Sequence, residues 1–382
     1  MLEMMIIFAF FIFYALFGQI FVTLLMSLFS RSKVKKSDHY KPRVSLMIAA
    51  YNEENNIEEK ILNSLKLDYP RELLRIVVVS DGSTDDTDSI VESYASEGVH
   101  LVRVEGRVGK TEARNVAVLK EKSEIIVFSD ATAIYEVDAI SKLVRNFNDP
   151  TVGMVSGNLS YRDQKNGRMG FATKLFWKYE NLIKNAQSKL KTLTGAVGCI
   201  HAFRRELFYR LPANIIEDFT GPLMIIANNH RVVFEREAIA YERTTSTPSQ
   251  EFKMRVRVIR GGMKGFLFAL PKLKEAKKFG AIFQLLSHKM MRWLMPFFMF
   301  GFYLSNLLVL LENEHVIFQF TFAVQAFAYL LALLGLLDIK VKGMNPFINF
   351  ATYFVVTNAA SAVALFKTLT EDLEATWETN VY

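Results

Sequence analysis

Four long segments without charged residues limit the folds open to this chain. They cover residues 4–30, 293–311, 316–337 and 345–366 of the 382-residue sequence. A helix that crosses a bilayer needs about 20 apolar residues. A cleaved signal peptide is an alternative for the first segment, but that segment is too long and lacks a basic start. We therefore predict four transmembrane helices.

Basic residues beside these segments predict the orientation, because Lys and Arg gather at cytosolic flanks. Four of them follow the first segment at 31–36, two precede the second at 289–292, and two join the third to the fourth at 340–342. The pattern predicts an integral protein of the cell membrane with a cytosolic middle region. Both termini are expected on the opposite side.

The net charge of +7 favours some partners over others. The basic residues of the chain concentrate at the membrane flanks and around 255–260. This distribution favours anionic lipid and phosphate as partners and argues against nucleic acid. Cys199 is the single cysteine. The chain therefore has no internal disulfide and no cysteine metal cluster, as expected in a reducing compartment.

The middle region has the pattern of an α/β domain. Short apolar runs at 44–50, 75–80 and 124–129 alternate with amphipathic stretches, which predicts a mostly parallel sheet with helices between its strands. Asn55 or Asn56 is positioned to cap the first of those helices. Each run ends in polar residues that include an acid, and the carboxyl ends of parallel strands form ligand sites. One acidic strand end would more often be a helix cap, but three together indicate a site.

Two further stretches, 169–190 and 266–291, are amphipathic. Each fits a helix in the membrane surface or a helix that faces the core.

Eight short motifs follow one another in the middle of the chain. They are YNEE at 51–54, VSDGSTDDT at 79–87, GKTEARN at 109–115, SDA at 129–131, WKYE at 177–180, GAVG at 195–198 with RRE at 204–206, and EDF at 217–219. In this order they resemble the family 2 glycosyltransferases of GT-A fold, over about 44–261. With the flanking apolar segments, the chain resembles the membrane-bound branch that includes hyaluronan, chitin and cellulose synthases.

The resemblance implies a donor site for a nucleotide sugar, with UDP as the expected nucleotide. It assigns uridine recognition to Glu53 and Asp81, and Tyr51 belongs to the same motif. Carboxylates can accept hydrogen bonds from ribose hydroxyls and a base N–H; Asp81 is alternatively a turn residue. Lys110 and Arg114 lie four residues apart, so they would present two cations to a diphosphate near a helix N-terminus.

Asp130 is the predicted metal ligand. Mg²⁺ or Mn²⁺ prefers oxygen donors and keeps several waters, so one or two carboxylates and the diphosphate suffice. Many relatives carry a second acid two residues later. This chain has Thr132 there, which leaves the second protein ligand open.

Asp218 is the predicted general base. A single displacement that inverts the anomeric carbon needs a carboxylate beside the acceptor hydroxyl, and apolar neighbours would keep it basic. Glu217 is the alternative base. Arg257 and Arg260 stand where processive relatives carry Gln-x-x-Arg-Trp, so Arg260 could neutralise the departing diphosphate. The same arginines could instead bind anionic lipid. The missing Trp weakens the prediction of a long polymer product.

The sequence thus predicts five parts: a transmembrane helix at 1–30, a basic cytosolic linker at 31–43, a GT-A domain at 44–245, interfacial helices with the arginine motif at 246–288, and three transmembrane helices with a short acidic tail at 289–382. The predicted function is an inverting transferase acting on a membrane-associated acceptor, such as a lipid-linked saccharide or growing glycan. A processive synthase that translocates its polymer is the alternative. A transporter is disfavoured because no ionisable residue interrupts the apolar segments.

Overall fold

An eight-stranded sheet forms the centre of the domain, in the order β3-β2-β1-β4-β7-β6-β8-β5. The computed structural model describes residues 1–30, 32–162, 170–243, 247–312, 315–372 and 375–376. Its strands are β1 Val44–Ala50, β2 Leu74–Asp81, β3 Val99–Val104, β4 Ile125–Asp130, β5 Ile134–Tyr135, β6 Val152–Arg162, β7 Ile200–Arg204 and β8 Arg231–Arg243. The three predicted strands correspond to β1, β2 and β4, so the α/β fold class is confirmed.

Strand directions decide which residues share an edge. Strands β3, β2, β1 and β4 are parallel. Strand β7 is antiparallel to β4 and to β6, and β8 is parallel to β6. It follows that the carboxyl ends of β1, β2, β4 and β8 lie at one edge. In register, Ala50 is opposite Ser80 and Ala49 is opposite Asp130, which brings the three predicted polar strand ends together.

Helices cover both faces of the sheet, which explains why its central strands are apolar on both sides. On one face, Leu46 and Ile48 of β1 pack with residues of α3 Ile57–Leu65, α4 Thr87–Ser93 and α6 Ala139–Val144. On the other face, Met47 packs with residues of α5 Lys110–Lys120, α8 Glu217–Ala227 and α9 Pro248–Glu275. Asn56 is the N-cap of α3 as predicted, but its side chain makes no capping bond. Its amide donates to Glu53 Oε2 at 2.8 Å instead.

Helix α8 approaches α9 closely because α9 carries glycines at the contact. A methyl group at Gly265 would collide with Thr220 Oγ1, and one at Gly261 would lie 2.8 Å from Ile216 Cγ2. The close packing fixes the first turn of α8, where Glu217 and Asp218 lie.

The remaining long helix of the domain, α7 Gly170–Lys189, packs between the sheet and the apolar helices. It arises from the amphipathic stretch predicted at 169–190, of which residue 169 lies outside the described residues. Its Ile183 and Ala186 are buried, so α7 is a packed helix. The stretch 266–291 is not one helix: it contains the end of α9, then α10 Phe279–Gln284, the π-helix η6 Leu285–Met290 and the start of α11 Met291–Trp293.

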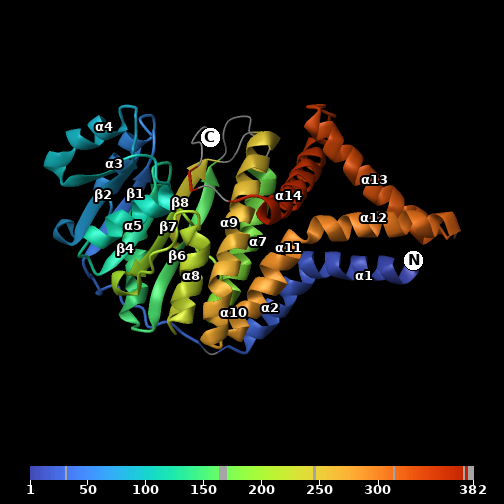
Figure 1. Ribbon diagram of the computed structural model, residues 1–382, viewed down its shortest axis with the longest axis horizontal. Helices are drawn as coiled ribbons and strands as arrows, with labels where there is room; N and C mark the ends of the chain where they lie inside the picture. Colours follow the sequence, from blue (N-terminus) through green and yellow to red (C-terminus); the bar gives the residue numbers. More distant parts are fainter. Residues whose placement is uncertain (31, 163–169, 244–246, 313–314, 373–374, 377–382) are drawn as a thin grey trace.

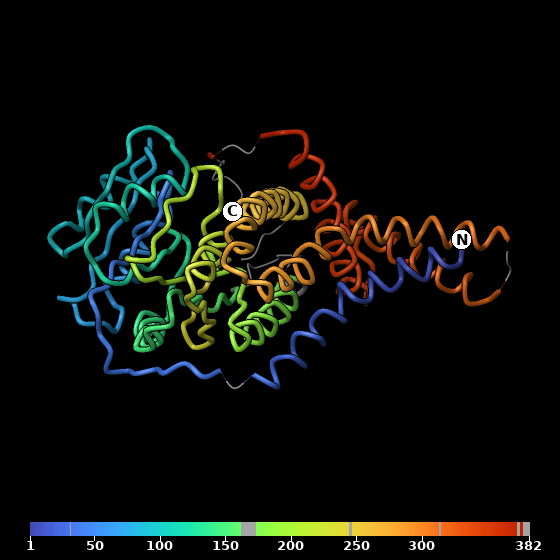
Figure 2. Tube along the Cα trace, turned by 60° about the horizontal axis from the view of Figure 1, so that its bottom comes forward, coloured from blue at the N-terminus to red at the C-terminus, as the bar shows by residue number. Residues whose placement is uncertain are grey.

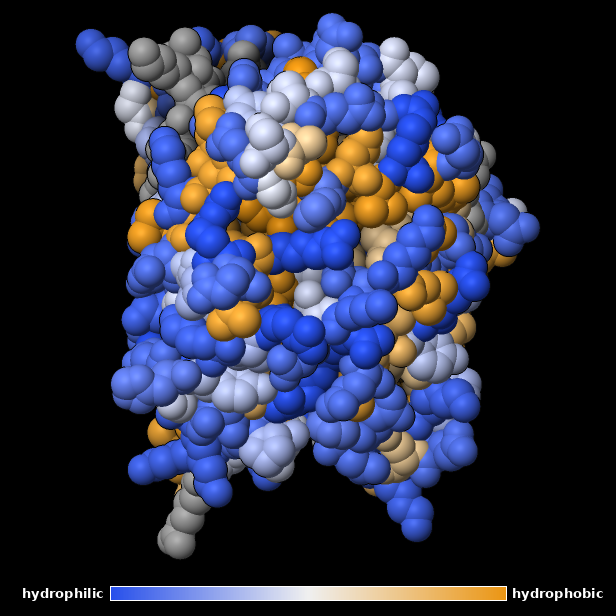
Figure 3. Space-filling view, turned by 90° about the vertical axis from the view of Figure 1, so that its left-hand side faces the viewer, coloured by the Kyte–Doolittle hydropathy of each residue, from blue (hydrophilic) through white to orange (hydrophobic). Residues whose placement is uncertain are grey.

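Among the residues that the structure describes, four helices are long and apolar enough to cross a membrane: Leu2–Leu28, Met295–Glu312, Val316–Leu336 and Asn345–Thr370. The first comprises α1 Leu2–Phe13, the π-helix η1 Tyr14–Gly18 and α2 Gln19–Leu28; the others are α12, α13 and α14. Helices α1, α12 and α13 project away from the domain (Figure 1), and Phe11 stacks on Phe298 with ring centroids 5.0 Å apart. The end of the molecule opposite this projection is largely hydrophilic, with an apolar band across its upper part and smaller apolar patches below it (Figure 3).

Helix α14 and the residues after it return to the domain. Helix α14 packs along α9 and α7, and Arg260 of α9 donates to the carbonyls of Lys367, Glu371 and Asp372 at 3.4, 3.4 and 3.2 Å. The predicted position of the C-terminus on the far side from the catalytic region is therefore wrong for the described tail. The charged residues beside the apolar segments do not indicate that the chain after α14 returns to the domain.

Residues 32–43 of the basic linker predicted at 31–43 run along the outside of the domain to β1 (Figure 2). Its backbone is held by the domain: Lys35 N donates to Asp149 Oδ2 at 3.3 Å, and Arg231 donates to the Lys33 carbonyl at 3.0 Å. These contacts join the first apolar helix to the sheet.

Candidate active site

Asp130 is the centre of a charge network at the carboxyl edge of the sheet. Its Oδ1 accepts from Lys110 Nζ at 2.6 Å and from Arg114 Nη2 at 2.9 Å. Burial alone would raise the pKa of Asp130, but the two cations outweigh it and lower that pKa. The Asp130 side chain is 28% exposed, so it is ionised and accessible.

Lys110 and Arg114 have different environments. The Lys110 side chain is 20% exposed and the Arg114 side chain is 1% exposed. Arg114 also pairs with Glu217 and donates to the Ser129 carbonyl at 2.8 Å. Arg114 thus holds two acidic side chains in place, whereas Lys110 remains near the surface. The predicted contact of both cations with a diphosphate stays a prediction.

Glu217 and Asp218 open α8, and their environments separate their pKa values. Burial would raise the pKa of Glu217, but Arg114 and then Lys110 lower it to about 2. Burial and the Glu217 charge raise the pKa of Asp218 to about 6. Glu217 is thus committed to Arg114 and to Thr111 Oγ1 at 3.1 Å, while Asp218 has the pKa of a usable base.

Gly198 makes room for the Asp218 carboxylate. A methyl group on Gly198 would lie 2.6 Å from Asp218 Oδ2. The same segment is tied to α8, because Ala196 N donates to the Asp218 carbonyl at 2.8 Å. The predicted GAVG motif therefore lies against the candidate base.

Asp81 holds the loop before α5. Its two carboxylate oxygens accept from Val108 N at 2.8 Å and Gly109 N at 2.9 Å. Gly109, the N-cap of α5, has a φ of 92°, which favours glycine. Ala375 of the C-terminal segment lies directly over Gly109. In this structure Asp81 positions a loop, which agrees with the turn reading.

Tyr51 and Glu53 lie at the neighbouring end of β1. The Arg107 guanidinium lies 4.3 Å from the centre of the Tyr51 ring. Burial raises the pKa of Glu53, and the charge of Asp130 adds to that rise. The backbone N–H of Glu53 donates to Thr87 Oγ1 at 2.8 Å, so the first two acidic loops are bound to each other.

The two predicted arginines, Arg257 and Arg260, lie on α9. Arg257 is partly exposed. Arg260 binds the C-terminal carbonyls described above and pairs with Glu371 at 3.5 Å. Arg260 thus contacts the described residues that end at Asp372, while Ala375 lies over Gly109.

Sequence reasoning missed Glu242 and Lys60. Glu242 is near the end of β8, and burial followed by the Asp130 charge raises its pKa to about 7. Lys60 of α3 is fully buried and donates to the Ala133 carbonyl at 2.5 Å. Glu242 is one more acidic strand end, so the rule that found Asp130 could have found it. Lys60 lies three residues after Ile57 and beside Ile61 on the buried face of α3, so helical spacing could have marked it as buried.

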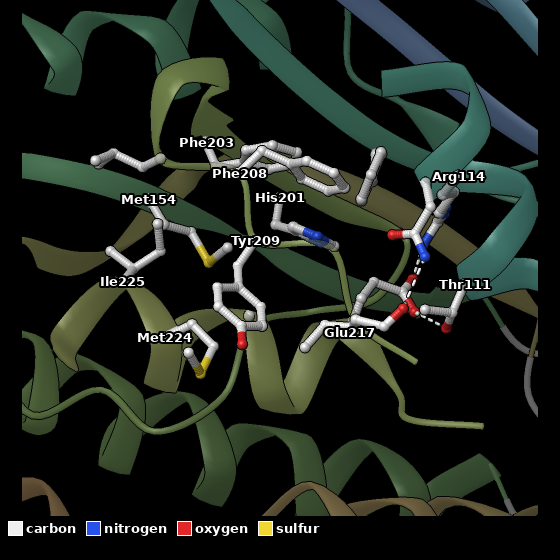
Figure 4. A pocket seen from close by; sticks show the side chains of 15 residues that line it. Thr111, Arg114, Met154, His201, Phe203, Phe208, Tyr209, Glu217, Met224 and Ile225 are labelled. Atoms are coloured by element: carbon white, nitrogen blue, oxygen red, sulfur yellow. Dashed lines mark hydrogen bonds and ion pairs between the residues drawn. The ribbon is translucent and has the colours of Figure 1, made fainter. Parts of the chain in front are cut away.

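An apolar pocket lies behind the acidic pair (Figure 4). Thr111, Arg114 and Glu217 border it at one end, and its other walls are largely apolar: Met154, Phe203, Phe208, Tyr209, Met224 and Ile225. Such walls exclude water from the Arg114–Glu217 pair and strengthen its attraction. They account for the burial that acts on the pKa of Glu217.

The residues at the rim fit a hard divalent cation. No group of three or more His, Cys, Asp or Glu side chains in the described part of the chain is arranged to hold a metal. Mg²⁺ and Mn²⁺ do not need such a group when a diphosphate and waters complete the shell. Asp130 is ionised and accessible, and Glu242 is a second carboxylate whose pKa responds to Asp130.

Comparison with known proteins identifies the domain. Residues 45–211 match the family model for glycosyl transferase family 2. This chain carries a family 2 glycosyltransferase domain. The match covers the strands and loops that bear Glu53, Asp81, Lys110 and Asp130, so the predicted resemblance is confirmed.

Two relatives are poly-β-1,6-N-acetyl-D-glucosamine synthases. The one from Staphylococcus epidermidis is 25% identical over 241 residues, which is 61% of this chain. The one from Staphylococcus aureus strain MSSA476 is 26% identical over 246 residues, which is 62% of this chain. The matched region spans 58% of the length of each synthase.

A mannosyltransferase from Pyrobaculum calidifontis, solved with GDP-Man and Mn²⁺, has the same fold. It superposes with a TM-score of 0.70 and 24% identity, covering 96% of this chain and 99% of that one. The likeness therefore extends beyond the sheet to the apolar helices. It confirms the predicted GT-A fold.

Proposed function

We propose that this protein transfers a sugar, with inversion, from a nucleotide diphosphate donor to an acceptor held at the membrane. The observation that supports this proposal most is the difference between the pKa values of the two acidic residues that begin α8. Glu217 has a pKa of about 2 and Asp218 a pKa of about 6. Two carboxyl groups with pKa values pushed apart by their surroundings mark distinct chemical roles.

Donor binding is assigned to the edge of the sheet. The N-terminus of α5 offers backbone N–H groups and a positive dipole end, and Lys110 adds a charge there, so this region suits a diphosphate. Tyr51, Glu53 and Asp81 line the neighbouring loops and are the proposed contacts of the nucleoside. Uridine is the proposed base, since the relatives are named as N-acetylglucosamine polymer synthases.

The proposed cofactor is Mg²⁺ or Mn²⁺. Asp130 would hold it, with Glu242 as the second carboxylate in place of the acid that Thr132 replaces. When bound, the cation would neutralise charge on the leaving diphosphate. Lys110 would have to release Asp130 Oδ1 partly and turn to the phosphate, a change that its partial exposure allows.

Asp218 is the proposed general base. At neutral pH a carboxyl group with a pKa of about 6 is ionised and still basic enough to accept the proton of an acceptor hydroxyl. Glu217 stays ionised against Arg114 and keeps Arg114, and through it Asp130, in position. Arg257 and Arg260 are proposed to act on the departing diphosphate together with the C-terminal segment.

The acceptor is proposed to be a lipid-linked saccharide or a growing glycan at the cytosolic face. The apolar helices adjoin the side of the domain formed by α7, α9 and η6, so a membrane acceptor would approach from there. The basic linker after the first helix supports a cytosolic domain. A processive synthase that translocates its polymer is the second candidate, and it is favoured by the names of the two bacterial relatives.

Thermal stabilisation of the full-length protein by a panel of UDP-, GDP- and dTDP-sugars, with and without Mn²⁺, tests the proposal. A ligand that binds only the folded state stabilises it by about 2.7 kcal/mol at a hundredfold excess over Kd. We expect UDP-sugars to stabilise most and to require the cation. No stabilisation by any nucleotide sugar would refute the proposal. Product length separates the two candidates, since single additions would exclude a processive synthase.

A further inference from the structure

Lys184 of α7 is buried, and its ammonium makes no hydrogen bond or ion pair in the described part of the chain. The residue is 6% exposed. Its ammonium lies 4.7 Å from the centre of the Trp177 ring and 6.0 Å from that of Phe234. No described carboxylate or carbonyl oxygen accepts a hydrogen bond from it. Buried charges in proteins are normally paired, so this ammonium calls for an anion.

The nearest carboxylate on the same helix cannot supply that anion. Glu180 is one turn away and is already bound by His288 at 3.1 Å, by Lys289 at 3.2 Å and by Arg292. Two basic side chains, Lys289 and Arg292, thus surround one carboxylate before Lys184 is considered. Lys184, Glu180, Lys289 and Arg292 together form a cluster beside α7, which we call the α7 cation cluster. It has more positive than negative charge.

The cluster lies between the candidate base and the membrane helices. Burial lowers the pKa of Lys184 to about 8, and the charges of Glu180 and then Asp218 oppose that shift. On the same helix, Tyr179 donates to the Leu16 carbonyl of η1 at 2.9 Å and accepts from Gln19 of α2 at 2.6 Å. Helix α7 therefore links the Asp218 side of the domain to the first apolar helix.

Trp177 adds a surface for the rest of a ligand. It is partly exposed and packs beside Tyr161, with ring centroids 5.8 Å apart. An indole ring next to a cation suits a molecule with both a sugar or isoprenoid face and an anionic group. A neutral acceptor would leave the ammonium of Lys184 buried and unpaired.

We propose that Lys184 binds a phosphate group of a lipid-linked acceptor and so brings the acceptor hydroxyl to Asp218. The phosphate is assigned to a membrane lipid because α7 contacts the first apolar helix, whereas a soluble acceptor would have no need of that position. This inference rests on the proposed function and adds the chemical class of the acceptor. Lys184 acts as a binding and positioning residue and takes no part in the proton transfer.

Binding of farnesyl phosphate to the full-length protein in phosphatidylcholine nanodiscs tests the proposal. Saturating UDP and Mn²⁺ keep the donor site filled, so the probe reports on a separate site. The neutral alcohol farnesol and inorganic phosphate are the comparison ligands. The variants are Lys184→Met, Lys184→Arg and, as a matched control, Lys178→Met, which removes an exposed lysine from the same helix.

We expect Lys184→Met to weaken farnesyl phosphate binding about tenfold or more, because a charge-assisted hydrogen bond is lost. Lys184→Arg should retain most of the affinity, and Lys178→Met and the affinity for UDP should not change. Equal binding by Lys184→Met and the unmodified protein would overturn the proposal. So would equal binding of inorganic phosphate, which would assign the site to a free anion.

Two further readouts keep the test decisive. If Lys184→Met fails to fold, the unmodified protein still decides, since farnesol binding as tightly as farnesyl phosphate would overturn a phosphate site. The UDP measurement separates this proposal from the proposed function. Absence of UDP binding would refute the donor site, while phosphate-dependent binding of the farnesyl probe that depends on Lys184 would still support the anion site.

Discussion

Replacement of the candidate base should make the protein inactive and more stable at the same time. The pKa of Asp218 rises from 3.8 to about 6, first through burial and then through the charge of Glu217. A rise of about 2 pH units corresponds to at most about 3 kcal/mol of unfavourable energy in the ionised form. Asp218→Asn keeps the shape and removes that charge. We expect activity to fall by about 10² to 10⁴.

The sign of the stability change follows from proton binding. Between about pH 4 and pH 6 the folded protein holds the Asp218 proton more tightly than the unfolded chain, so the free energy of unfolding falls as pH rises through that window. Above about pH 6 the full destabilisation is present. Asp218→Asn should therefore be more stable than the unmodified protein at pH 7.5, by at most about 3 kcal/mol, and nearly equal to it at about pH 4.

The assay is thermal unfolding of both proteins in the same detergent at about pH 4 and at pH 7.5, combined with kcat/KM from pH 5 to 8. The unmodified protein should lose activity about tenfold per pH unit below about pH 6, because only the ionised carboxylate is a base. A flat pH profile, or a variant that is less stable at pH 7.5, would refute the assignment. Glu217→Gln is the control: loss of the partner of Arg114 should destabilise the fold by about 3–5 kcal/mol.

Four other substitutions test separate parts of the site. Gly198→Ala should lower kcat about 10²-fold with little change in nucleotide KM, since its methyl group would lie 2.6 Å from Asp218 Oδ2; unchanged kinetics would contradict the close approach. Lys110→Met should raise the nucleotide-sugar KM about tenfold or more, and a change in kcat alone would contradict its role in donor binding. Glu242→Gln should weaken Mn²⁺ binding about tenfold, measured by electron paramagnetic resonance of free Mn²⁺ with UDP present; unchanged binding would leave Asp130 as the sole carboxylate ligand. Gly265→Ala should lower the free energy of unfolding by about 1–3 kcal/mol, measured by denaturant titration, because it collides with Thr220; a neutral change would mean that α8 and α9 separate easily.

The sheet was predictable because its strands are nearly continuous apolar runs with polar ends. Strands β1, β2 and β4 are almost entirely buried and each ends in an acidic turn, so the pattern alone predicted them and their shared edge. The four apolar helices were also predictable, because an uncharged apolar run of this length is typical of a helix that spans a membrane. These features depend on local sequence.

The parts that could not be predicted depend on contacts between distant residues. Arg114 reads as a surface cation on α5, yet Glu217, 103 positions later, buries it in an ion pair. Lys184 reads as one of several lysines on an amphipathic helix, and only the packing of α7 against β8 and η6 isolates it. The return of the tail to Arg260 likewise requires the orientation of α14, which hydropathy does not report.

A structure of the full-length protein with UDP and Mn²⁺ tests the central claim most directly. The account predicts Mn²⁺ at an Asp130 oxygen, about 2.2 Å away as for hard cations and carboxylates, with the diphosphate between Lys110 and the N-terminus of α5. The carboxylate of Asp218 should face the open side where the sugar would lie. A nucleotide bound elsewhere, or a cation that does not contact Asp130, would contradict the account.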